Sequence, residues 1–185
     1  MLINFCSNCG NTMQFGVIDG DHLPRHNCNN CGFISYQNPK IIVGCFPIWK
    51  NEVMLCRRGI EPRLGFWNLP GGFMELNETI EMGAVREMKE ETGVDVKIIG
   101  LHSIFSVPQV NQLHLHFLAE LTDLEYKLTP ESTEIKLFNE ENTPWSEIAF
   151  ASTDFGLKSY YFDLINNQRK IHIGSTLIHK FSPIY

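Results

Sequence analysis

The sequence predicts an α+β protein, in which a mixed sheet lies between helices in an α/β/α sandwich and a small cysteine-rich unit comes first. Three observations support this prediction: strand-like apolar segments occur together with two helix-like segments, the first 36 residues contain few apolar runs, and the chain has 185 residues. That length fits one ordinary domain with a small appendage. We therefore expect one unit at residues 1–36 and a larger domain at residues 40–185.

Apolar segments of strand length begin at residue 41. Residues 41–49 and 53–58 predict two strands joined by a short turn. Each strand contains one cysteine, Cys45 in the first and Cys56 in the second. We expect both to be inert core residues, because small thiols are commonly buried.

Further strands are predicted later in the chain. In residues 110–121 apolar side chains alternate with mostly polar ones, which is the pattern of a strand with one buried face. His114 and His116 fall on the other face of this strand and are expected to be exposed. Strand-like segments also occur at 94–107, 134–138 and 171–178.

Two segments have the spacing of helices. In residues 78–92 apolar side chains recur three and four positions apart, with Asn77 as the expected N-cap and Gly93 as the expected stop. A second helix is predicted to begin at Ser152-Thr153-Asp154 and to end near Asn166. Its expected buried side chains are Phe155, Tyr161 and either Leu164 or Ile165.

Composition and charge restrict the classes of function. Apolar residues make up 43% of the chain, which allows a packed core, and no apolar stretch is long enough to span a bilayer. The 15 basic and 21 acidic residues give a net charge of −6, which argues against nucleic acid or an anionic membrane as the main partner. The first ten residues lack the pattern of a signal peptide, so we expect a cytoplasmic protein.

Four cysteines form two pairs, Cys6-x-x-Cys9 and Cys28-x-x-Cys31, each followed by a glycine. In a chain without a secretory pattern this spacing favours a metal over disulfides, and four thiolates complete a tetrahedral zinc site with no open position. A unit with so few apolar residues is expected to need this structural zinc in order to fold. His26, close to Cys28, remains an alternative ligand.

Three carboxylates recur on one side of the first predicted helix. Glu87, Glu90 and Glu91 are spaced i, i+3 and i+4, so their side chains are expected to project from one face and to converge. Like charges at this spacing repel one another unless cations lie among them, and hard oxygen ligands suit Mg²⁺ or Mn²⁺. The preceding Gly71-Gly72 lets the backbone approach the same ions. We therefore expect a metal-lined diphosphate site, and the alternative is a solvated acidic helix.

The whole segment resembles the Nudix box. It reads Gly72-x5-Glu78-x7-Arg86-Glu87-apolar-x-Glu90-Glu91-x-Gly93-apolar, with no departure from that pattern. The resemblance implies a Nudix-type fold and divalent-metal-dependent hydrolysis of the diphosphate linkage of a nucleoside diphosphate derivative. It also implies that the three glutamates bind the metal, that the Gly72 carbonyl is a further ligand, and that Arg86 holds a carboxylate in place, with Glu78 as its partner.

The box does not say which group accepts the proton of the attacking water. Members of the family use either a glutamate of the helix or one from a later loop. Glu134, in the segment Glu131-Ser-Thr-Glu134, resembles the later acidic position. The alternative for Glu134 is an exposed strand carboxylate.

The surroundings of the box resemble one branch of the family. Zinc ribbons precede Nudix domains in NADH pyrophosphatases and in a group similar to FAD and ADP-ribose pyrophosphatases. Residues 106–113 depart from the Ser-Gln-Pro-Trp-Pro-Phe-Pro stretch of the NADH branch, and residues 144–150 also look like the second group. The resemblance therefore implies FAD or ADP-ribose as substrate, with release of AMP, and NADH or NAD as the alternative.

Residues just before the box are candidates for substrate binding, since phosphates require basic groups and a nucleobase requires an aromatic or apolar slot. For the aromatic rings the alternative is core packing, and for the arginines it is a solvated surface. A function of another class also stays open, in which the chain is a non-catalytic regulator that binds nucleic acid or protein. The resemblance adds a homodimer as a candidate assembly. The candidate substrate-binding residues are Arg57, Arg58, Arg63, Phe66 and Trp67.

Overall fold

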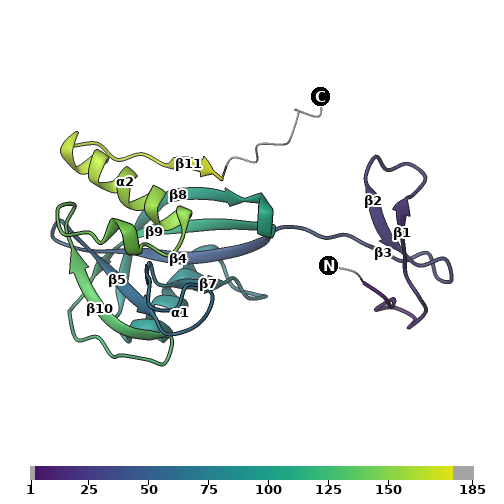
Figure 1. Cartoon of the computed structure of the whole chain (residues 1–185), viewed down its shortest axis with the longest axis horizontal. Helices are drawn as coiled ribbons and strands as arrows, with labels where there is room; N and C mark the ends of the chain where they lie inside the picture. The colour runs from purple at the N-terminus through teal and green to yellow at the C-terminus, as the bar shows by residue number, and fades with distance from the viewer. Residues whose placement is uncertain (1–2, 177–185) are drawn as a thin grey trace. The chain divides into compact units, whose positions relative to one another are not determined.

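The structure is a computed structural model that describes residues 3–176. The chain divides into two compact units, Met1–Asn38 and Pro39–Tyr185. Figure 1 shows the helices and strands of each unit. No helix within residues 3–176 is long and apolar enough to cross a membrane.

The first unit is a small antiparallel sheet with two cysteine-bearing turns. Its strands, in the order β1-β2-β3, are β1 (Gln14–Val17), β2 (Pro24–Asn27) and β3 (Ile34–Ser35). In each turn a glycine N–H donates to the carbonyl of the first cysteine of the pair, Gly10 to Cys6 and Gly32 to Cys28, both at 2.8 Å. Both glycines have a φ near +75°, a backbone conformation that favours glycine. The small buried cluster of this unit consists of Cys6, Met13 and Cys28.

The second unit contains an eight-stranded mixed sheet, in which the main path is β10-β5-β4-β9-β8-β11. The short strands β6 and β7 pair with β5 and β4. The pairs β4–β9 and β8–β11 are parallel, and the other pairs are antiparallel. The strands are β4 (Lys40–Trp49), β5 (Glu52–Arg58), β6 (Trp67–Asn68), β7 (Gly71–Phe73), β8 (Val96–Val107), β9 (Gln112–Leu121), β10 (Ser132–Phe138) and β11 (His172–Ser175).

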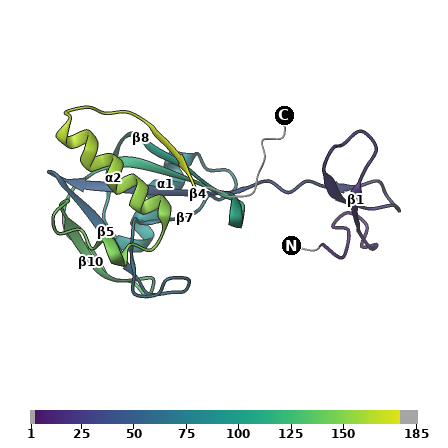
Figure 2. The same ribbon diagram turned by 45° about the horizontal axis from the view of Figure 1, so that its top comes forward.

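Two helices cover the two faces of this sheet, as Figures 1 and 2 show. Helix α1 (Ile80–Thr92) packs through Ala84 and Met88 on one face, and α2 (Ala151–Ile165) packs through Leu157 and Tyr161 on the other. Successive side chains of the central strands alternate between the two cores, as expected for a strand buried on both faces. The predicted α/β/α sandwich with a mixed sheet is confirmed.

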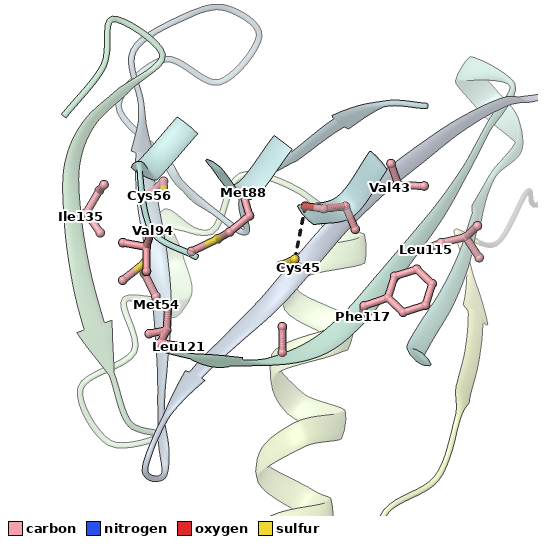
Figure 3. Close-up of a cluster of buried hydrophobic side chains, with 12 residues drawn as sticks. Val43, Cys45, Met54, Cys56, Met88, Val94, Leu115, Phe117, Leu121 and Ile135 are labelled. Atoms are coloured by element: carbon pink, nitrogen blue, oxygen red, sulfur yellow. Dashed lines mark hydrogen bonds between the residues drawn. The ribbon is translucent and has the colours of Figure 1, made fainter. Parts of the chain in front are cut away.

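The core beneath α1 is shown in Figure 3. Cys45 and Cys56 lie fully inside it, and the Cys45 thiol donates to the Ala84 carbonyl at 3.3 Å. Burial raises the pKa of the Cys45 thiol to about 12 and raises that of Cys56 as well. Both cysteines are therefore neutral core residues at physiological pH, as the sequence predicted.

Details at the helix ends differ from the prediction. The N-cap of α1 is Thr79, whose side chain accepts from the Met82 N–H, whereas Asn77 lies in the preceding turn with a φ of 66°. Helix α2 begins at Ala151 after Phe150, and no side chain caps it. Its last turn is exposed, so the expectation that Leu164 or Ile165 is buried was wrong. Of the predicted last strand, residues 177 and 178 lie outside the described residues.

Candidate active site

A cavity of about 550 Å³ opens beside the glycine-rich turn of the second unit. Its lining comes from segments far apart in the sequence: β4, the end of β5, β7, α1, β9, the loop before β10 and the start of α2. The volume is in the range of small-molecule sites. The residues that line the cavity include Arg58, Gly71, Gly72, Glu87, Gln112, His114, Glu91, Glu131 and Phe150.

The glycine turn fits tightly between β4 and α1. A Cβ atom on Gly71 would lie 2.7 Å from the Gly44 Cα, and one on Gly72 would lie 2.6 Å from the Glu87 carboxylate. Real Cβ atoms do not approach so closely, so glycine is required at position 71, where the neighbour is backbone, whereas a Cβ at position 72 would displace the Glu87 carboxylate. The turn therefore brings backbone into contact with the carboxylates of α1.

Glu91 is the most deeply buried carboxylate of the cavity. Its Oε1 accepts from the Gly71 N–H at 2.9 Å, and its Oε2 accepts from the Ser132 hydroxyl at 3.1 Å. Burial raises the pKa of Glu91 to about 7, although these two hydrogen bonds oppose the shift. Burial also raises the pKa of Glu87. Partly desolvated carboxylates are a fitting donor set for a divalent ion.

Arg86 organises the carboxylates next to the turn. Its guanidinium donates to both oxygens of Glu78, at 2.9 and 3.0 Å, and to the Phe73 carbonyl at 3.2 Å. The same group donates to Glu87 at 2.8 Å and to Glu90 at 3.1 Å. The bidentate pair with Glu78 confirms the partner that the sequence predicted for Arg86. Arg86 thus joins α1, the loop before it and the backbone of β7.

The three glutamates of α1 are less tightly grouped than the spacing predicted. Among residues 3–176 they do not form a set of ligand atoms within 4.8 Å of one another, because Arg86 holds Glu87 and Glu90 while Glu91 is directed to Gly71 and Ser132. All three nevertheless line one hollow, which also contains Gly72 and Glu131. Carboxylate and carbonyl oxygens are the donors that a hard divalent cation prefers.

Two models of known protein families match this chain. Residues 38–154 match the family model described as NUDIX domain, and residues 4–37 match the model described as Nudix N-terminal. The first match alone spans more than half of the chain. The chain belongs to the Nudix family. It is therefore a Nudix hydrolase with the family's N-terminal ribbon, as its sequence motifs predicted.

Several named Nudix proteins are similar to this chain. The ADP-ribose pyrophosphatase of Methanocaldococcus jannaschii is 32% identical over 113 residues, which are 59% of this chain and 67% of that protein. The NAD-capped RNA hydrolase NudC of Pseudomonas aeruginosa is 34% identical over 136 residues, which are 71% of this chain and 45% of NudC. The chain thus spans about half the length of the NudC relatives.

Solved structures show the same architecture. A NUDIX hydrolase from Nitrosomonas europaea is 44% identical with a TM-score of 0.90, and the match covers 94% of this chain and 99% of that one. An ADP-ribose pyrophosphatase from Streptococcus suis is 18% identical with a TM-score of 0.61, covering 74% of this chain and 99% of that one. The second likeness concerns the fold alone.

Glu134, which the sequence suggested as the later acidic residue of this Nudix domain, lies outside the cavity. Glu134 lines neither hollow, because its carboxylate pairs with Arg57 at 3.1 Å and with Lys136. Glu131, three residues earlier, lines both. The Glu131 carbonyl accepts from the Gly59 N–H at 2.8 Å, which fixes this loop to the end of β5. The pairing of β10 with β5 places Glu131 at the cavity, and no local pattern in the sequence indicates this position.

Of the five substrate-binding candidates, Arg58 lines the cavity of the Nudix domain. Trp67 is 4% exposed and packs edge-on against Phe138, which agrees with the core alternative. Arg57 pairs with Glu134 and Glu147 outside the cavity. Arg63 and Phe66 contact each other, with the guanidinium carbon 5.4 Å from the ring centroid, and do not line the cavity.

Two histidines that the sequence placed in solvent line the Nudix cavity instead. His116 is 5% exposed and its Nδ1 is 3.1 Å from the Ser103 hydroxyl, and the His114 Nδ1 is 3.0 Å from the Ser152 hydroxyl. Burial lowers the pKa of His114, and it lowers that of His116 to about 3. The expectation of exposure was wrong because the start of α2 and β7 cover this side of β9.

The Nudix N-terminal unit brings its four cysteine sulfurs together, all within 4.8 Å of one another. The Sγ atoms of Cys6 and Cys31 are 3.7 Å apart, and those of Cys9 and Cys28 are 3.6 Å apart. Tetrahedral zinc with Zn–S bonds of about 2.3 Å requires sulfur separations of about 3.8 Å. These spacings are too long for a disulfide and fit a zinc site. The His26 Nε2 instead accepts from the Ile3 N–H at 3.2 Å.

Proposed function

We propose that this Nudix hydrolase cleaves the diphosphate linkage of a nucleoside diphosphate derivative, FAD or ADP-ribose, and releases AMP. The observation that carries the proposal is the buried Glu91, which lies with Glu87 and the Gly71-Gly72 turn in one cavity of about 550 Å³. The similarity to the Methanocaldococcus jannaschii protein named ADP-ribose pyrophosphatase supports the choice of substrate.

The carboxylates of α1 and the Gly72 carbonyl would hold Mg²⁺ or Mn²⁺ in this mechanism. When bound, such ions neutralise the bridging phosphates and lower the pKa of an attacking water. Arg86 keeps Glu87 in position through its fixed bonds to Glu78 and Phe73. Apolar walls, including Leu69 and Val107, limit the access of other water molecules.

Glu131 is the better-placed proton acceptor, and Glu134 is the alternative suggested by sequence. Glu131→Gln keeps the side-chain size and removes the base, so kcat is expected to fall about 100-fold or more. Glu134→Gln is the matched variant three residues away, outside both hollows, and is expected to leave kcat within a few-fold of wild type. A larger fall in kcat for Glu134→Gln than for Glu131→Gln would assign the role of proton acceptor to Glu134.

NADH and NAD are the second candidate substrates, because NudC proteins, named as NAD-capped RNA hydrolases, are also similar to the chain. The deciding experiment incubates the protein with Mg²⁺ and FAD, ADP-ribose or NADH, and measures AMP by chromatography. A kcat/KM that is higher for FAD or ADP-ribose than for NADH supports the proposal. No AMP from any of the three, together with tight binding of RNA, would favour the regulator instead.

We also propose that Cys6, Cys9, Cys28 and Cys31 hold structural zinc, on the strength of their sulfur spacing.

The proposed homodimer is tested by light scattering coupled to size-exclusion chromatography. A mass close to 42 kDa, twice the 21.2 kDa of one chain, supports it, and a mass near 21.2 kDa contradicts it.

A further inference from the structure

One wall of the cavity pairs an aromatic ring with a guanidinium group. Phe150 precedes α2, Arg58 ends β5, and both side chains line the cavity and are half-buried. The Arg58 Cζ lies 5.0 Å from the centroid of the Phe150 ring. This distance is within the range of a cation–π contact, so the guanidinium lies over one face of the ring and the two groups pack together in the cavity wall.

This wall is held in place by the protein itself. The Arg58 Nε donates to the Pro62 carbonyl at 2.8 Å. The Arg58 backbone is fixed on both sides, by its N–H to the Phe66 carbonyl and by the Gly65 N–H to its own carbonyl, each at 2.8 Å. A ligand that binds here therefore loses little free energy to ordering the protein.

The charges around the cavity indicate which part of a substrate this wall contacts. Among the described residues, Arg58 is the one lysine or arginine that lines the cavity, and four carboxylates line it as well. Phosphates are therefore better placed at the end of the cavity where divalent ions would be held. The four carboxylates are those of Glu61, Glu87, Glu91 and Glu131.

An uncharged, flat group suits the wall better than a phosphate does. Aromatic rings and the plane of a guanidinium both stack on nucleobases, and stacking tolerates any base because every base has a π face. Arg58 lies over one face of the Phe150 ring and its Nε donates to Pro62, so a base can stack on an outer face of this pair. Ile60 and Pro62 extend the same side of the cavity with apolar surface.

We propose that Phe150 and Arg58 bind the nucleobase of the substrate by stacking, and that they determine its preference for a nucleoside at this end of the cavity. The proposal rests on the proposed function, since it deepens the substrate assignment of the same site. Neither residue takes part in bond breaking. Their loss therefore raises KM and leaves kcat nearly unchanged.

The test uses Phe150→Leu, which keeps an apolar side chain and removes the aromatic face. Stacking on one base is worth about 1–3 kcal/mol, which corresponds to an increase of about 5- to 150-fold in the KM for ADP-ribose. Phe150→Tyr is expected to keep a KM close to wild type. Phe162→Leu is the matched control, because Phe162 is exposed on α2, the helix that follows Phe150, and does not line the cavity.

A binding measurement separates the nucleobase from the rest of the substrate. Calorimetry with AMP and with ribose 5-phosphate, both in Mg²⁺, compares ligands that differ by the base alone. The full-length wild-type protein is expected to bind AMP more tightly, and Phe150→Leu is expected to remove most of that difference without weakening ribose 5-phosphate.

Equal weakening of both ligands, or no change in either, would overturn the proposal. Circular dichroism of each variant shows whether the fold is kept, and Phe150→Tyr provides the same comparison if Phe150→Leu fails to fold. A wild-type protein that prefers AMP over ribose 5-phosphate through Phe150, but hydrolyses none of FAD, ADP-ribose and NADH, would refute the proposed function and retain this inference.

Discussion

Glu91→Gln is expected to make the metal-free protein more stable while it abolishes turnover. The substitution keeps the size of the side chain, and its amide oxygen can accept from the Gly71 N–H while its NH2 group donates to the Ser132 hydroxyl oxygen. It removes a charge that burial disfavours, because the pKa of Glu91 is raised to about 7 in the folded protein. The carboxylate that we propose as a metal ligand is thus a group that the metal-free fold tolerates poorly.

The size of the effect follows from the two pKa values. An acid whose folded pKa is raised destabilises the fold as pH rises from its ordinary value of 4.5 through about 7. At pH 8 the full penalty applies, and it amounts to about 3 kcal/mol, since a tenfold change in the ionisation constant is about 1.4 kcal/mol. For a domain of this size that corresponds to a Tm higher by about 6–12 °C in the variant.

Thermal unfolding in buffer without magnesium or manganese measures this difference. The variant should exceed wild type at pH 8, and the gap should close as the pH falls toward 5. Added Mg²⁺ should raise the Tm of wild type more than that of the variant, because an ion that binds the folded state stabilises it. A variant with a lower Tm than wild type at pH 8, or with near-normal AMP release, would refute the reasoning.

Three other expectations concern the turn, a buried histidine and the ribbon. Gly72→Ala places a Cβ 2.6 Å from the Glu87 carboxylate, so kcat should fall about 10- to 100-fold with the fold retained, and an unchanged kcat would contradict the packing argument. Burial lowers the pKa of His116 to about 3, so the folded protein holds this side chain in its neutral form. The folded state therefore loses stability as the pH falls below 6.5, the ordinary pKa of histidine, because protonation then favours the unfolded chain. Urea unfolding at pH 7.5 and 5 should show about 2 kcal/mol of this loss in wild type and less in His116→Gln; equal losses would exclude His116 as the cause. Cys28→Ser should reduce the zinc content measured by metal analysis from about one equivalent per chain, and wild-type protein purified reduced but without zinc would remove the assignment.

Local sequence was sufficient where a single segment carries all the chemistry. The i, i+3, i+4 spacing placed Glu87, Glu90 and Glu91 on α1, and the box identified Glu78 as the partner of Arg86, because these residues lie on one helix and the loop before it. The N-cap was missed by two residues. Asn77 and Thr79 are both good capping residues, and the path of the preceding turn decides between them.

Local sequence was insufficient where strand order decides the neighbours. Alternation in β9 correctly separated the two faces of the strand, but it assigned the side of His114 and His116 to solvent, whereas β7 and the start of α2 cover it. Glu131 is an exposed loop residue with no pattern of its own. It reaches the cavity because the Gly59 N–H binds its carbonyl where β10 begins to pair with β5.

The sequence by itself determined the family, the helix that bears the carboxylates and the cysteine ribbon, since each is encoded in one short stretch of the chain, residues 72–94 for the box and its helix and residues 6–31 for the cysteines. The tertiary structure alone decided that Arg58, Glu131 and Phe150 share a cavity with Glu91. Their proximity results from β5 lying between β10 and β4 and from α2 packing on the far face. Contacts between distant segments depend on the whole sheet, and no short stretch of sequence contains that information.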